Sequence, residues 1–182
     1  MGQSGTKLVL ILAGLALTAG VTSWLYRYEA AHQATTFWGV EAARLIAQPA
    51  EAEVFVLTVP GAEGIAEEGV ELLDLGRKYQ PGEAKGLTNA RGMVHLRHAL
   101  MSDGSYEWDA PVDPATVDWG WCLRFFDGER EVLVVLSEDL AVIGQVVVGG
   151  QTAVEAYSCR PLTESLQVYF TDLSLLDAST EE

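Results

Sequence analysis

The chain has 182 residues and a formal net charge of −15, with 26 acidic residues against 11 Lys and Arg. This acidity argues against nucleic acid and against docking on anionic lipid, because both depend on Lys and Arg to neutralise phosphate. The length suits one domain that buries a hydrophobic core. We take the acidic side chains to be a soluble surface rather than a ligand site.

An uncharged apolar segment, LVLILAGLALTAGVTSWLY, covers Leu8–Tyr26. It matches the roughly 20 residues that a helix needs to cross a bilayer, and its aromatic end followed by Arg27 is typical of a membrane interface. It predicts a signal anchor over residues 1–27, with a cytoplasmic N-terminus and an extracytoplasmic body in a single-pass membrane protein. The alternative is a signal peptide cleaved after Ala19 or Ser23, which would leave a secreted protein.

The residues after this segment predict a helix and then a domain. Residues 28–48 lack proline and carry apolar side chains at helical spacing, so they predict an amphipathic helix that ends before Pro49. We expect residues 49–176 to form an α+β domain and residues 177–182 to be an acidic, disordered tail.

The first half of this domain predicts two strands and a helix. Glu53–Val59 is rich in β-branched and aromatic residues, and Val70–Arg77 is a second strand candidate. Asn89–Met101 carries apolar residues at helical spacing and is followed by Asp-Gly, which favours a helix stop. Ser105–Asp118 is expected to be a loop too polar to join the core.

The second half predicts a three-stranded β-meander over Trp119–Val148 and a final helix from Pro161. Asp127-Gly128 suits the tight turn of its first hairpin. The fold class is therefore α+β: an N-terminal transmembrane helix, then a mainly antiparallel sheet of about five strands packed with helices. The residues expected to share one face of the first meander strand are Trp119, Trp121, Leu123 and Phe125.

The densest cluster of functional side chains lies on the predicted central helix. Arg91, His95 and His98 fall at i, i+4 and i+7, on one helix face, with Asp103 as a carboxylate able to orient a histidine. This pattern predicts a ligand face for an anion or a metal, and the alternative is an ordinary solvent-facing surface. No Glu follows His95, so the zinc-protease motif is absent. We predict no catalytic residue, no metal ligand set and no cofactor, since the sequence has no P-loop, nucleophile elbow or dinucleotide fingerprint.

Cys122 and Cys159 are the two cysteines of the chain. Outside the cytoplasm such a pair can form a structural disulfide, and in a reducing compartment it would be two buried thiols. The spacing alone leaves both alternatives open.

Two resemblances bear on the fold. GLTNARGMVHLRHALMSDGSYEW, at Gly86–Trp108, together with WCLRFFDGEREVLVVLSEDL, resembles small exported bacterial proteins of unassigned function, which implies a compact α+β domain and no particular activity. The order of apolar helix, continuing helix, antiparallel sheet and late cysteine pair is similar to a type IV pilin or pseudopilin. The chain departs from that pattern after Gly5, because the fifth residue on is Leu10 rather than Glu.

These observations lead to a functional hypothesis. We expect a membrane-tethered, extracytoplasmic, non-enzymatic accessory domain that binds a protein partner. One alternative is an enzyme, or a binder of a small ligand or metal, that uses the face formed by Arg91, His95 and His98. Another is a pseudopilin-like assembly subunit.

Overall fold

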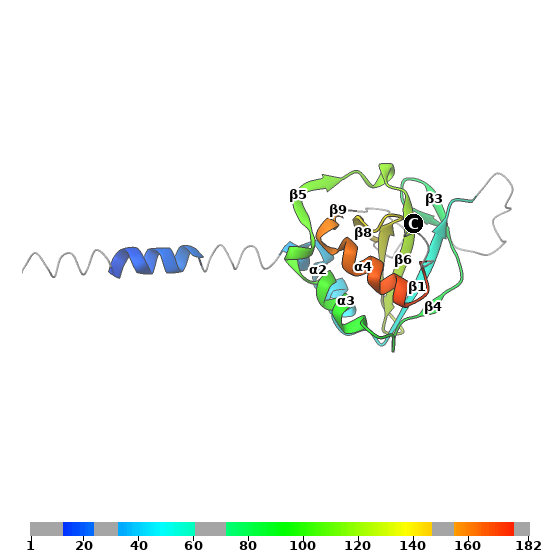
Figure 1. Cartoon of the computed structure of the whole chain (residues 1–182), viewed down its shortest axis with the longest axis horizontal. Helices are drawn as coiled ribbons and strands as arrows, with labels where there is room; N and C mark the ends of the chain where they lie inside the picture. Colours follow the sequence, from blue (N-terminus) through cyan, green and yellow to red (C-terminus); the bar gives the residue numbers. More distant parts are fainter. Residues whose placement is uncertain (1–12, 24–32, 61–71, 147–154, 177–182) are drawn as a thin grey trace, which may run out of the picture. The chain divides into compact units, whose positions relative to one another are not determined.

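The computed structural model describes residues 13–23, 33–60, 72–146 and 155–176. The chain divides into two compact units, Met1–Gln33 and Ala34–Glu182. The second unit carries the sheet and the helices that pack on it (Figure 1). The tail predicted over residues 177–182 lies outside the described residues.

The transmembrane helix predicted over Leu8–Tyr26 is wrong. Within the described part of that segment, a helix covers residues 13–23. Among the described helices, none is both long and apolar enough to cross a membrane. The signal anchor and the single-pass localisation are therefore not supported, and residues 8–12 and 24–26 lie outside the described residues.

The second unit is built on one antiparallel sheet. It has nine strands among the described residues: eight pair in the order β2-β3-β1-β6-β7-β8-β9-β5, and the ninth, β4, pairs with β1. The expectation of about five strands is wrong, because several of the strands are too short to show an alternating apolar pattern. Their bounds are Glu51–Thr58 (β1), Leu73–Asp74 (β2), Lys78–Pro81 (β3), Lys85–Gly86 (β4), Glu107–Val112 (β5), Trp119–Phe126 (β6), Glu131–Ser137 (β7), Val142–Val146 (β8) and Ala156–Ser158 (β9).

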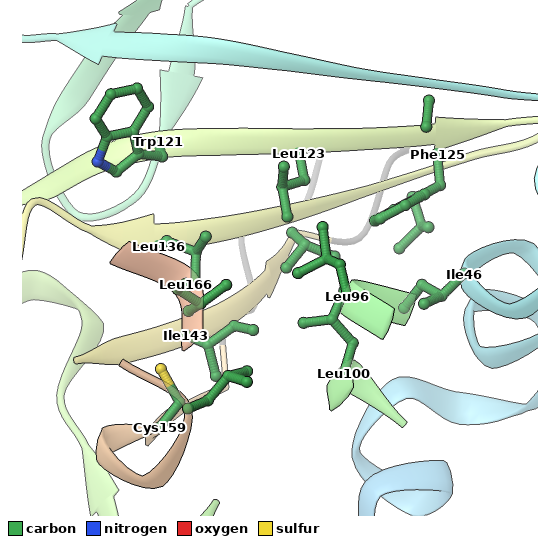
Figure 2. Close-up of a cluster of buried hydrophobic side chains, with 14 of the residues drawn as sticks. Ile46, Leu96, Leu100, Trp121, Leu123, Phe125, Leu136, Ile143, Cys159 and Leu166 are labelled. Atoms are coloured by element: carbon green, nitrogen blue, oxygen red, sulfur yellow. The ribbon is translucent and has the colours of Figure 1, made fainter. Parts of the chain in front are cut away.

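Three helices pack against the sheet and bury the larger of two hydrophobic clusters. They are α2 (Gln33–Ala47), α3 (Met93–Leu100) and α4 (Arg160–Asp172). Figure 2 shows Leu123 and Phe125 of β6 on the sheet side of this cluster, with Leu96 and Leu100 of α3 among the helix side chains. Fully burying such a side chain stabilises the fold by about 1.5–3 kcal/mol, so this cluster holds helices and sheet together.

The smaller cluster lies where alternate side chains of the central strands point away from the helices. It contains Leu57 of β1, Cys122 of β6 and Val135 of β7, covered by Leu75 and Tyr79 from the β2–β3 region. The sheet is therefore apolar on both faces.

A β-bulge moves Trp119 to the second cluster. The pairing of β6 with β7 shifts register between Trp119 and Trp121. Trp121 packs in the larger cluster, whereas Trp119 packs in the smaller one, so the prediction that all four alternating residues share a face is wrong for Trp119. Gly120 fits the bulge because a Cβ there would lie 2.8 Å from the Cα of Glu138.

The other predicted elements are partly confirmed. The meander is confirmed as β6, β7 and β8, with Gly128 at a φ of 96° in the first hairpin, and α4 begins next to Pro161. Of the strand predicted at Val70–Arg77, the described residues retain only β2. The polar loop predicted at Ser105–Asp118 is wrong, because it contains β5 and the buried side chain of Tyr106.

Candidate functional site

The predicted ligand face lies at the start and on the solvent side of α3. Arg91 precedes the helix, since Gly92, with a φ of 90°, turns the chain into it and the helix begins at Met93. His95 and His98 are both exposed, and the residues that α3 buries are Met93, Leu96 and Leu100. This is the arrangement of an ordinary amphipathic helix. Within the described residues, no group of three or more His, Cys, Asp and Glu side chains could hold a metal ion.

Asp103, the fourth residue of that face, contacts a different helix. Its Oδ1 accepts a hydrogen bond from the backbone N–H of Ala34 at 2.6 Å, and its carbonyl accepts one from Trp108 Nε1 at 3.0 Å. The carboxylate thus satisfies a backbone donor in the first turn of α2, where helices leave N–H groups without intrahelical partners. Asp103 therefore has a structural role, because it supports the first turn of α2.

The two cysteines are free and buried. Cys122 packs in the smaller cluster and Cys159 in the larger one, so the disulfide considered from the sequence is not formed. Burial raises the pKa of each thiol to about 12, and the Cys159 thiol donates to the carbonyl of Leu140 at 3.3 Å. Both are protonated at neutral pH and lack the thiolate character of a reactive cysteine.

The feature that the sequence did not predict is a break in α2. Gly39 has a φ of 70° and a ψ of 160°, a combination that is almost restricted to glycine. The sequence predicts a helix through this point, and the two helical stretches on either side of Gly39 have different directions as a result. After the break, Val40 is 75% exposed.

A pocket of about 800 Å³ lies between the broken part of α2 and the β6–β7 hairpin. Residues 38–42 and Leu45 supply its α2 wall. Arg124, Phe126 and residues 128–132 supply the hairpin wall, with Gln145 and Val146 of β8 beside them. The apolar side chains that line it are Trp38, Val40, Ala42, Leu45, Phe126, Val132 and Val146.

Arg124 is the inner of the two cations that line this pocket. Its Nε lies 2.6 Å from Glu131 Oε2, and its Nη1 lies 3.6 Å from Oε2 of Glu53, which is directly opposite on β1. The guanidinium also lies 4.6 Å from the ring centroid of Phe126, a cation–π distance. Two carboxylates and an aromatic ring therefore fix the position of Arg124.

Arg130 is the outer cation and links the hairpin to α2. Its Nη1 lies 2.8 Å from Glu41 Oε2, and its Nε donates to Asp127 Oδ2 at 3.1 Å. The hydrogen bonds that Arg130 donates hold the pKa of Asp127 below its ordinary value. Each of the two guanidiniums is therefore shared by two carboxylates, and Glu129 of the lining is exposed beside them.

Burial raises the pKa of Cys122, Cys159, Tyr106 and Tyr169, which are core residues and do not line the pocket. Arg130 does line it, and its hydrogen bond to Asp127 raises the pKa of its guanidinium. Sequence reasoning missed the pocket, although Arg124 in the strand WCLRFF is a charge between aromatic residues and Gly39 interrupts a predicted helix.

No protein-family model, no curated protein and no solved structure matches the chain.

Proposed function

We propose that the Ala34–Glu182 unit is a non-enzymatic binding domain that takes a segment of a partner protein into the pocket between α2 and the β6–β7 hairpin. The observation that carries the proposal is the pocket itself: about 800 Å³, apolar over much of its lining and bordered by fixed charges. Ligand sites of proteins are concave, have volumes of about 300–1,000 Å³, and combine an apolar lining with a few polar groups that fix orientation.

The physical state of the ionisable groups supports binding over catalysis. A general acid or base needs a pKa near the working pH and a position beside the substrate. The two thiols are buried in the core and do not line the pocket, and the ionisable side chains that do line it include the ion-paired Arg124, Arg130, Glu41 and Glu131. Paired charges beside apolar side chains are the groups that fix the orientation of a bound segment, and this supports binding.

The test is a nuclear magnetic resonance titration of ¹⁵N-labelled protein with pools of blocked five-residue peptides. We expect shift changes at residues 38–45 and 124–132. Val40→Ser should weaken the response, because it removes an exposed apolar side chain from the lining. Val168→Ser, at an exposed valine of α4 outside the pocket, is the matched control.

Two outcomes would overturn the proposal. In one, no pool produces saturable shifts at the pocket. In the other, the shifts cluster around His95 and His98 and respond to neither valine substitution, which would transfer the binding role to α3.

A further inference from the structure

We propose that the partner segment presents a lysine or arginine beside an apolar side chain, and that this cation takes the place of Arg130 at Glu41. The inference rests on the proposed function, since it names the chemistry of the segment that the pocket accepts. It is drawn from the charges around the pocket and from the different exposure of its two arginines.

The charge balance around the pocket favours a cation. Arg124 is shared by Glu53 and Glu131, and Arg130 is shared by Glu41 and Asp127. Each arginine therefore leaves one negative charge uncompensated, and the exposed Glu129 adds another. An anionic ligand would have to displace a carboxylate and add negative charge to a chain of net charge −15. A cationic side chain meets a complementary potential instead.

The two arginines differ in how easily a ligand displaces them. The side chains of Arg124 and Glu131 are 37% and 30% exposed, and Arg124 also lies against Phe126. Those of Arg130 and Glu41 are 48% and 73% exposed. Exposed ion pairs contribute little to stability because water and salt screen them, so exchange at Glu41 costs little. Arg124 stays in place, and Glu41 becomes the acceptor for the ligand cation.

The surroundings of Glu41 explain why the partner segment needs an apolar side chain beside its lysine or arginine. Val40 precedes it and is exposed, and Phe126 and Leu45 line the same pocket. The aliphatic stem of a lysine or arginine packs on apolar surface while its charged end reaches a carboxylate. An apolar side chain next to it fills the remaining volume and removes further apolar area from water.

The test measures dissociation constants by calorimetry for three blocked peptides of the sequence alanine–leucine–X–leucine–alanine, where X is lysine, glutamine or glutamate. We expect the lysine peptide to bind about two- to fivefold more tightly than the glutamine peptide, as an ion pair at an exposed carboxylate implies, and the glutamate peptide to bind most weakly. Glu41→Gln should remove most of the preference for lysine.

Glu164→Gln is the matched control, because it removes the same charge from an exposed position on α4 outside the pocket. If the preference for lysine falls equally in both variants, the net charge of the chain explains it and the role of Glu41 is refuted. If the glutamate peptide binds best, the inference fails while the proposed function stands. If none of the peptides binds at the pocket, the proposed function itself fails.

Discussion

Replacing Gly39 by alanine tests whether the backbone break that forms one wall of the pocket is real. A Cβ at this position would meet no atom within 4 Å, so the substitution creates no clash. The cost comes from the backbone alone: holding a non-glycine residue at a φ of 70° and a ψ of 160° costs about 1–3 kcal/mol. Alanine recovers about 0.4–1 kcal/mol by restricting the unfolded chain. We therefore expect Gly39→Ala to lower the free energy of unfolding by about 1–2 kcal/mol.

Urea denaturation followed by circular dichroism measures this change, and in a domain of this size each kcal/mol also lowers Tm by about 2–4 °C. Gly86→Ala is the control, since a Cβ there also meets no atom within 4 Å but its φ is not positive. That variant should stay within about 0.5 kcal/mol of the parent chain. A Gly39→Ala protein as stable as the parent, or more stable through a continuous α2, would refute the reasoning.

Four further predictions concern the core, the bulge and the cysteines. Leu123→Ala should lower the free energy of unfolding by about 2–5 kcal/mol, because Leu123 is fully buried between β6 and the helices; a loss below 1 kcal/mol in urea would contradict its place in the core. Gly120→Ala should also destabilise the protein, since its Cβ would lie 2.8 Å from backbone of Glu138, and an unchanged urea midpoint would argue against the bulge. Maleimide should label Cys122 and Cys159 in denatured, unreduced protein but not in native protein at pH 7; the absence of any label after denaturation would reveal a disulfide between them. Burial raises the pKa of both thiols from 9.0 to about 12, so their contribution to stability is complete below pH 9 and is lost as the pH rises towards 12. The urea midpoint should therefore fall between pH 8 and pH 10. A midpoint that rises over this range would contradict the sign of this effect.

The parts of the fold that the sequence predicts are those with a long, regular apolar period. The alternation through β6 and β7 and the stripe of α4 each extend over several residues, so local pattern and packing agree. The position of Cys122 between Trp121 and Leu123 already places its thiol on the opposite sheet face from those two side chains. The alternation of side chains along β6 is therefore more informative about a disulfide than the number of cysteines is.

The remaining parts depend on contacts between residues distant in the sequence. Strands β2, β3 and β4 are short and are defined by pairing with each other or with β1, which no local pattern records. Hydropathy alone predicted the transmembrane helix, and none of the described helices is long and apolar enough to cross a membrane. At the pocket, Glu41 contacts Arg130, which is 89 residues away in the sequence. Glu41 follows the backbone break at Gly39, and the helical spacing of apolar residues does not reveal this break.

The measurement that tests the binding account most directly is the affinity of the lysine peptide for Arg130→Gln compared with the parent chain. Removing Arg130 frees the carboxylate of Glu41, to which its Nη1 is bound at 2.8 Å, while Arg124 and the apolar lining stay in place. The account predicts tighter binding in the variant, by at least about threefold, because the ligand cation no longer competes with an internal one. Weaker binding of the lysine peptide would contradict the account. A loss of binding confined to the glutamate peptide would show that Arg130 recognises an anion and would contradict it as well.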